Sequence, residues 1–199
     1  MKIAVAVTGA SGAVYARLLV ERLAKTEEVE ELALIFTDNG KQVMEYEEGM
    51  EWLQEFSFIR YFDNRDFNAP VASGSGDYDA LVLVPCSAGM MGRIANGISD
   101  DLVSRAADVM LKERRLLILV LRETPLTSIH IDNMKAITVA GGIVMPAAPF
   151  FYSRPSSIEE LCGTVIQRIM SLLKLSSGQD FHWGGPISFS SKVIQDGFN

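Results

Sequence analysis

The segment KIAVAVTGASG, residues 2–12, decides how the chain folds. Its first part is an almost wholly apolar run, and the run ends at a turn of four small residues, 9–12. Directly afterwards, apolar side chains recur at helical spacing: Val14, Leu18, Leu19 and Leu23. A buried strand, a tight glycine turn and an amphipathic helix in this order predict the first unit of an α/β fold.

The same alternation continues along the chain. Further strands are expected at residues 32–36, 80–84, 116–121 and 143–145. Helices are expected around Val43 and Met44 and at residues 88–95, 101–113, 127–140 and 158–173. Residues 48–67 are aromatic and charged without clear periodicity. We therefore predict one domain, residues 1–175, folded as a three-layer α/β/α sandwich with a mainly parallel, Rossmann-like (flavodoxin-like) sheet, followed by an extended tail at 176–199.

Composition excludes several classes of protein. A chain of 199 residues with 48% hydrophobic residues is long and apolar enough for one well-packed core. Its formal net charge of -7 argues against nucleic acid as the main partner. The apolar runs are too short for a membrane span or for the core of a signal peptide. The two cysteines have no paired spacing, so we expect a cytoplasmic protein.

The stretch RAADVMLKERR, residues 105–115, places charged side chains on one helical stripe. Arg105, Asp108 and Lys112 fall at i, i+3 and i+7, so the two cations stand roughly 10 Å apart along the axis. Arg122 and Glu123 follow the next predicted strand, at the edge where open α/β sheets bind ligands. This arrangement suits an anionic small molecule. The alternative is a plain surface helix with an i, i+4 pair between Asp108 and Lys112.

Three loops are expected to converge on that edge. Residues 9–12 form a G-x-S-G turn at a helix N-terminus, which suits either a phosphate or a plain tight turn, and the dinucleotide fingerprint G-x-G-x-x-G is absent. Residues 69–76 form a Gly/Ser loop that either connects flexibly or clamps a ring. Residues 85–90 again lead from strand to helix, and Cys86 within them is expected to be buried rather than nucleophilic.

Taken together, these motifs resemble the flavin prenyltransferases of the UbiX type, within the flavoprotein superfamily that also contains flavin-dependent cysteine decarboxylases. The resemblance runs from residue 2 to about residue 173 and keeps the family's order of motifs. The matching segments are TGASG (8–12), APVASGS (69–75), PCS (85–87), RAADVMLKERR (105–115), RETPL (122–126), IHIDNM (129–134), PAAPFFYSRP (146–155) and SIEEL (157–161).

The resemblance implies a metal-independent transferase that joins the dimethylallyl group of dimethylallyl phosphate to reduced FMN. The prenylated FMN would serve a UbiD-like decarboxylase. The residues implied to bind FMN are Gly9, Ala10, Ser11, Thr37, Ser87, Ala88, Gly89, Met90 and Arg122. Met90 and Met91 stand where the family often has a Thr-Leu pair, which would reshape the flavin wall.

The resemblance also implies a clamp for the dimethylallyl phosphate, formed by Arg105, Lys112, Tyr152 and Arg168. Because the family is oligomeric and commonly dodecameric, these residues would meet across subunit interfaces. Three cations and a hydroxyl donor suit a departing phosphate, whereas the carbon chain needs an electron-rich wall. The flavin face, with Trp183 of a neighbouring tail, would supply that wall.

Two residues are candidates for moving protons. Glu123 would exchange a proton with the phosphate, although a structural ion pair with Arg122 is the alternative. Ser11, beside the flavin, would help to reposition protons as the new ring closes. His130 is expected to anchor its helix by a hydrogen bond, and the isolated histidines and the pair Asp100-Asp101 do not predict a metal site.

Two other functions remain open at this point. A flavin-dependent cysteine decarboxylase would share the flavin loops but relies on an early histidine, and this chain has none before His130. A non-catalytic FMN carrier would keep the flavin loops without the phosphate clamp, whereas all four clamp positions are filled here. Turnover of dimethylallyl phosphate distinguishes the transferase from both.

Overall fold

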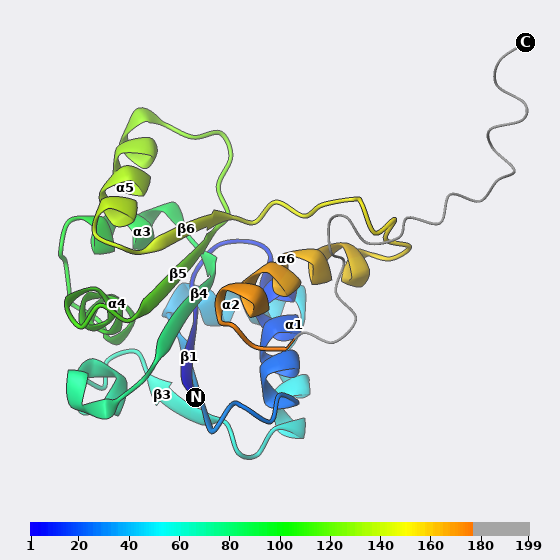
Figure 1. The fold of residues 1–199 in the computed structure, drawn as a ribbon, viewed down its shortest axis with the longest axis horizontal. Coiled ribbons are helices and arrows are strands. Elements are labelled where there is room, and N and C mark those ends of the chain that lie inside the picture. Colours follow the sequence, from blue (N-terminus) through cyan, green and yellow to red (C-terminus); the bar gives the residue numbers. More distant parts are fainter. Residues whose placement is uncertain (177–199) are drawn as a thin grey trace, which may run out of the picture.

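A six-stranded parallel sheet forms the centre of the computed structural model, which describes residues 1–176 (Figure 1). The strands are β1 (Lys2–Val7), β2 (Glu31–Phe36), β3 (Arg60–Asp63), β4 (Ala80–Cys86), β5 (Leu116–Leu121) and β6 (Ile143–Pro146). They lie in the order β3-β2-β1-β4-β5-β6, and every neighbouring pair is parallel. This is the doubly wound order of Rossmann-like folds, so the predicted fold class is confirmed.

Helices cover both faces of the sheet, three on each side (Figure 1). On one face lie α1 (Ala13–Ala24), α2 (Asp38–Glu47) and α6 (Ile158–Leu172). On the other lie α3 (Ala88–Ala95), α4 (Leu102–Lys112) and α5 (Ser128–Val139). Among these described helices, none has the length and apolar character needed to span a bilayer.

The apolar runs in the sequence reflect burial on both faces of the sheet. All seven residues of β4 are buried, and along β1 alternate side chains enter the two opposite cores. Ile3 and Val5 pack towards α1 and α6, whereas Ala4 and Ala6 face α3 and α4. Strands covered on both faces lack a polar face, so they appear in the sequence as continuous hydrophobic segments.

Short polar side chains fix where most of the helices begin. Thr37, Ser87, Asp101, Thr127 and Ser157 each cap a helix by accepting a hydrogen bond from a backbone N–H in its first turn. At α5 the cap is reciprocal, because the Thr127 N–H donates to Nδ1 of His130 over 3.3 Å. The prediction that His130 anchors its helix is confirmed.

The chain reverses its winding direction between β1 and β4, the topological switch point of the sheet. The two strands are neighbours, but α1 and α3 leave them towards opposite faces. Thr8 joins the two strand ends: its hydroxyl donates to the Pro85 carbonyl over 2.8 Å and accepts from the Ser87 N–H over 2.8 Å. Crevices at such a point are the usual ligand sites of open α/β sheets.

Several local predictions need correction. The stretch 48–67, which showed no pattern, contains a 3₁₀ turn (Glu51–Glu55) and the short edge strand β3. On α4, Asp108 pairs with Arg105 at 2.9 Å, and Lys112 pairs with Glu113. The i, i+4 pair between Asp108 and Lys112, which belonged to the alternative interpretation of this helix, does not form. The predicted boundary at residue 175 stays a prediction, and the tail beyond Ser176 lies outside the described residues.

The Gly/Ser loop is held by hydrogen bonds and by packing against α4, and it does not lie wholly at the ligand edge. It forms two 3₁₀ turns, Pro70–Ala72 and Gly74–Gly76, and the first of them packs against α4. Arg115 donates to the Gly74 carbonyl over 2.9 Å, just before β5 begins. That end of the loop therefore lies where the strands start. The sequence predicted that residues 69–76 meet the loops 9–12 and 85–90 at the ligand edge. For the second turn, Gly74–Gly76, this prediction is wrong.

Candidate functional site

The first helix begins without a side-chain cap of its own. Gly12 takes the N-cap position with φ +106°, a left-handed conformation that suits glycine. The missing acceptor comes from α2, because Oε2 of Glu47 accepts the N–H groups of Gly12 and Ala13, each over 2.8 Å. A carboxylate thus lies at the positive end of α1, where an anion is favoured.

Glu47 is held in its charged form by its surroundings. Partial burial by itself would raise the pKa of Glu47, but hydrogen bonds from the Ser11 side chain and from the Ala13 and Gly12 N–H groups outweigh it. The nearby charge of Arg122 acts in the same direction. The net result is a pKa below the ordinary value for glutamate, so Glu47 is a carboxylate at neutral pH.

Arg122 joins the end of β5 to the first loop. Its backbone N–H donates to the Cys86 carbonyl over 3.0 Å, and its side-chain Nε donates to the Ser11 carbonyl over 3.1 Å. The predicted position of Arg122, directly after a central strand, is confirmed. Its guanidinium adds positive charge beside the N-terminus of α1.

A cavity of about 440 Å³ opens between these groups. It is lined by Gly9, Ser11, Gln42, Val43, Tyr46, Glu47 and Arg122. Three predicted site residues, Gly9, Ser11 and Arg122, therefore come together in one subunit. The four residues from α2 were not predicted. They share one helical face at i, i+1, i+4 and i+5, but a local pattern does not say which loop that face meets.

The other predicted flavin residues border the switch point without lining this cavity. Ala10 and Met90 are buried, and Gly89 is exposed with open space around the position of a Cβ atom. The Ser87 hydroxyl caps α3 by accepting the Met90 N–H over 3.2 Å. Ala88 follows that cap as the first residue of the helix.

Thr37 has a structural role in the described chain. Its hydroxyl accepts the Gly40 N–H over 3.0 Å and donates to the Val7 carbonyl over 3.4 Å. The hydroxyl therefore fastens the start of α2 to the end of β1. A contact of Thr37 with FMN stays a prediction.

Glu123 is exposed and has no cationic partner among residues 1–176. Its Oε1 accepts the Thr124 N–H over 3.1 Å. The alternative of a structural ion pair with Arg122 is wrong for this subunit. The carboxylate is therefore available to a ligand.

The four predicted clamp residues do not meet within one subunit. Arg105 and Lys112 lie on α4, whereas Arg168 lies exposed on α6, on the other face of the sheet. Lys112 precedes β5 and Arg122 follows it. Because the six residues of β5 span roughly 20 Å, Lys112 and Arg122 lie at opposite ends of this strand.

Arg105 is held in place by its own chain. Its Nε donates to the Ala72 carbonyl over 3.1 Å and its Nη1 to Asp108 over 2.9 Å. Tyr152 lies on the connection from β6 to α6 with 65% of its surface exposed, and its ring centroid is 6.0 Å from that of Phe150. The fifth predicted substrate residue, Trp183, lies outside the described residues.

Cys86, at the end of β4, is too deeply buried to act as a nucleophile. Burial raises the pKa of the Cys86 thiol to about 12, so the expectation of an inert buried cysteine is confirmed. Within residues 1–176, no group of three or more His, Cys, Asp or Glu side chains is placed to hold a metal ion.

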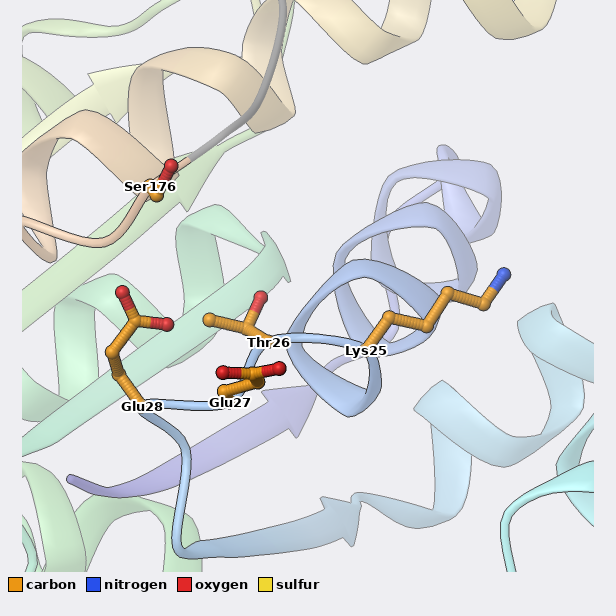
Figure 2. A pocket seen from close by; sticks show the side chains of 5 residues that line it. All are labelled: Lys25, Thr26, Glu27, Glu28 and Ser176. Carbon is orange, nitrogen blue, oxygen red and sulfur yellow. The ribbon is translucent and has the colours of Figure 1, made fainter.

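A second cavity, of about 560 Å³, lies beyond the C-terminal end of α1 (Figure 2). It is lined by Lys25, Thr26, Glu27, Glu28 and Ser176. Figure 2 shows the Lys25 side chain extending away from the two glutamates. Because α1 runs away from the Gly9 loop, this cavity is separate from the site at the switch point.

Comparison with known proteins places this geometry in a family. The model of the family described as Flavoprotein matches residues 1–170. Flavin prenyltransferase UbiX of Methanocaldococcus jannaschii is 40% identical over 185 residues, covering 92% of this chain and 99% of the relative. Flavin prenyltransferase UbiX of Pseudomonas aeruginosa is 38% identical over 198 residues, covering 92% and 94%.

Solved structures that are similar to this chain include proteins of the same type. A crystal structure of AnUbiX (PadA1) in complex with FMN and dimethylallyl pyrophosphate superposes with a TM-score of 0.83 at 38% identity, covering 94% of this chain and 98% of that one. A dodecameric FMN-dependent UbiX-like decarboxylase from Escherichia coli O157:H7 gives 0.87 at 34% identity, covering 93% and 100%. The cysteine decarboxylase TvaF, 20% identical with a TM-score of 0.59, shares the fold alone. The chain belongs to the Flavoprotein family and, within it, to the flavin prenyltransferases of the UbiX type.

Proposed function

We propose that the protein is a flavin prenyltransferase that joins the dimethylallyl group of a dimethylallyl phosphate ester to reduced FMN. The observation that carries the proposal is the cavity at the switch point, where Ser11, Glu47 and Arg122 from three different elements meet. Two relatives named flavin prenyltransferase, each 40% identical to this chain, support the proposal, as does a similar structure containing FMN and dimethylallyl pyrophosphate.

The residues around the cavity fit FMN. Gly89 leaves open space where a side chain would stand, so a flat ring can approach the backbone at the start of α3. Arg122 offers a positive charge for an electron-rich ring. The Ser11 hydroxyl, already engaged with the carboxylate of Glu47, can hold a proton close to a bound flavin.

Reduced FMN supplies the electron-rich ring that receives the dimethylallyl group when phosphate departs. In the protein, Arg105, Lys112 and Arg168 would neutralise the departing phosphate, and the Tyr152 hydroxyl would donate a hydrogen bond to it. Glu123 would exchange a proton with the phosphate oxygen. Glu47, charged at neutral pH, would accept the proton released through Ser11 as the second bond to the flavin forms.

The clamp would assemble between subunits. Arg105 and Lys112 lie on one face of the sheet and Arg168 on the other, so two or more copies are required to surround one phosphate. A dodecamer like that of the Escherichia coli neighbour would provide such contacts. The prenylated product would pass to a UbiD-like decarboxylase, and Trp183 would contribute an aromatic wall.

The test is a mass measurement on the released flavin. The purified protein is mixed with FMN, dithionite and dimethylallyl monophosphate without oxygen, and with the diphosphate in parallel. A gain of one C5H8 unit is expected, and Arg168→Ala should bind FMN without forming this product. Unmodified flavin with both esters would refute the proposal, and carbon dioxide released from a cysteine peptide would indicate a decarboxylase instead.

A further inference from the structure

We propose that Tyr46 is a flavin-binding residue that stacks on the ring of the bound flavin and closes the outer side of its pocket. The inference rests on the proposed function, because it assumes that the cavity beside Ser11 receives FMN. It adds a binding role for a residue of α2 that belongs to neither hydrophobic core of the described chain.

Tyr46 is the most exposed of the described tyrosines. It is 92% exposed, against 65% for Tyr152, 49% for Tyr61, 8% for Tyr15 and 1% for Tyr78. The buried pair contributes to the cores, and Tyr78 also donates to Glu31 over 2.5 Å. Among residues 1–176, Tyr46 has no aromatic neighbour in ring contact. Folding therefore does not explain a large ring at this position.

The composition of the cavity offers a better explanation for a tyrosine at position 46. Five of the seven lining residues are glycine, polar or charged, and only Val43 and Tyr46 present apolar surface. A flavin is flat and aromatic, and its ring needs an apolar surface on at least one side. Ring stacking on Tyr46 would supply that surface next to the charges of Glu47 and Arg122.

Tyr46 is also carried by a helix that is held by four contacts. Thr37 fastens the start of α2 to β1, and Met44 is completely buried in the core. At Gly9 a Cβ atom would come within 2.5 Å of Asn39, so the first loop and α2 are in close contact. Glu47, the next residue after Tyr46, reaches across to the start of α1. The ring is thus presented by a rigid frame, which lowers the entropic cost of binding.

The experiment compares FMN binding by four forms of the full chain. They are the wild type, Tyr46→Ala, Tyr46→Phe and the control Tyr61→Ala, which removes a tyrosine that is 49% exposed on β3. FMN is titrated by the quenching of flavin fluorescence, which reports stacking directly. Melting temperature and size-exclusion elution are recorded for each form.

The alanine variant at position 46 should raise the Kd for FMN by about tenfold and lose part of the quenching. Tyr46→Phe and Tyr61→Ala should bind as the wild type does, and all four forms should elute alike. Unchanged affinity and quenching in Tyr46→Ala would overturn the inference. So would weaker binding that accompanies a change in elution, because Tyr46 would then act in subunit contact.

Failure of the proposed function would look different. If the wild type binds FMN but never prenylates it, the transferase is refuted while the comparison of Tyr46 variants still decides the stacking. If the wild type binds no FMN, both the proposed function and the role of Tyr46 are refuted. Normal prenylation with equal FMN affinity in Tyr46→Ala would refute the role of Tyr46 alone.

Discussion

Nε of Arg122 donates a hydrogen bond of 3.1 Å to the carbonyl oxygen of Ser11, a residue 111 positions earlier in the chain. The bond joins the end of β5 to the loop after β1, across the intervening strand β4. A single side chain thereby fixes the position of the first loop and places a positive charge beside it. Arginine suits this role because Nε donates in one fixed direction while the remaining N–H groups stay available to a ligand.

Replacing Arg122 with lysine should separate these two roles. The charge remains, but the fixed Nε donor is lost, so we expect the Kd for FMN to rise by about tenfold, the equivalent of one charge-assisted hydrogen bond. FMN titration measures this change. Arg65→Lys is the control, since Arg65 is 83% exposed in a surface pair with Asp38. Equal affinity in Arg122→Lys and the wild type would show that charge alone matters.

Glu47→Gln should change how stability depends on pH. The pKa of Glu47 is lowered in the folded protein, so its charge stabilises the fold above the unfolded value of about 4.5. That contribution disappears as the pH falls through the lower, folded pKa. Glutamine keeps a carbonyl acceptor for the Gly12 and Ala13 N–H groups but not the charge, and the loss at pH 7 should be about 0.5 kcal/mol.

Urea unfolding at a series of pH values tests this expectation. The wild type should lose stability more steeply than Glu47→Gln as the pH drops below about 4.5. Glu45→Gln serves as the control, because Glu45 is an exposed residue of the same helix and does not line the cavity. Parallel pH profiles for wild type and Glu47→Gln would contradict the assigned charge.

Glu123→Gln should stop chemistry without affecting binding or folding. The side chain is exposed and makes no ion pair with residues 1–176, so the melting temperature should stay within the error of measurement. If Glu123 exchanges a proton with the phosphate, the rate of prenylation should fall at least about 100-fold. Single-turnover kinetics with prebound FMN measure that step. A rate within a few fold of the wild type would remove Glu123 from the proposed mechanism.

Two glycines at the site should respond in opposite ways to alanine. At Gly9 a Cβ atom would lie 2.5 Å from the Asn39 Cβ, so Gly9→Ala must shift backbone and should destabilise the protein by about 1–3 kcal/mol. At Gly89 nothing lies within 4 Å of a Cβ atom, so Gly89→Ala should fold normally. If flavin approaches the backbone there, this variant should nevertheless bind FMN more weakly than the wild type.

Thermal unfolding and FMN titration of Gly9→Ala and Gly89→Ala test these two expectations. Normal stability in Gly9→Ala would mean that the contact with Asn39 relaxes at little cost. Normal FMN affinity in Gly89→Ala would mean that the open space at α3 is not used by the flavin.

Local signals in the sequence predict most of the fold. The capping residues Ser87, Asp101 and Thr127 mark helix starts because a short side chain before an apolar periodic segment satisfies the free N–H groups of the first turn. Strands buried on both faces appear as apolar runs, and their alternation with helices determines a parallel sheet. The edge strand β3 was missed because it is largely exposed and lacks such a run.

The site could be predicted only where it depends on strand ends. Ser11 and Arg122 directly follow central strands, and the carboxyl ends of parallel strands share one edge. Glu47 and Tyr46 lie near the end of α2, and their place at the site depends on how α2 packs against the first loop. That packing is set by tertiary contacts, such as the one between Gly9 and Asn39, which leave no periodic signal in the sequence.

The position of Arg105 and Arg168 on opposite faces of the sheet has a genetic consequence. If each phosphate is held by residues of different subunits, Arg105→Ala and Arg168→Ala impair different halves of a shared clamp. Coexpressed in one cell, the two defective chains would form mixed assemblies in which some clamps are intact. Two inactive alleles would then complement each other, and the recovered fraction of activity would report how many subunits build one site.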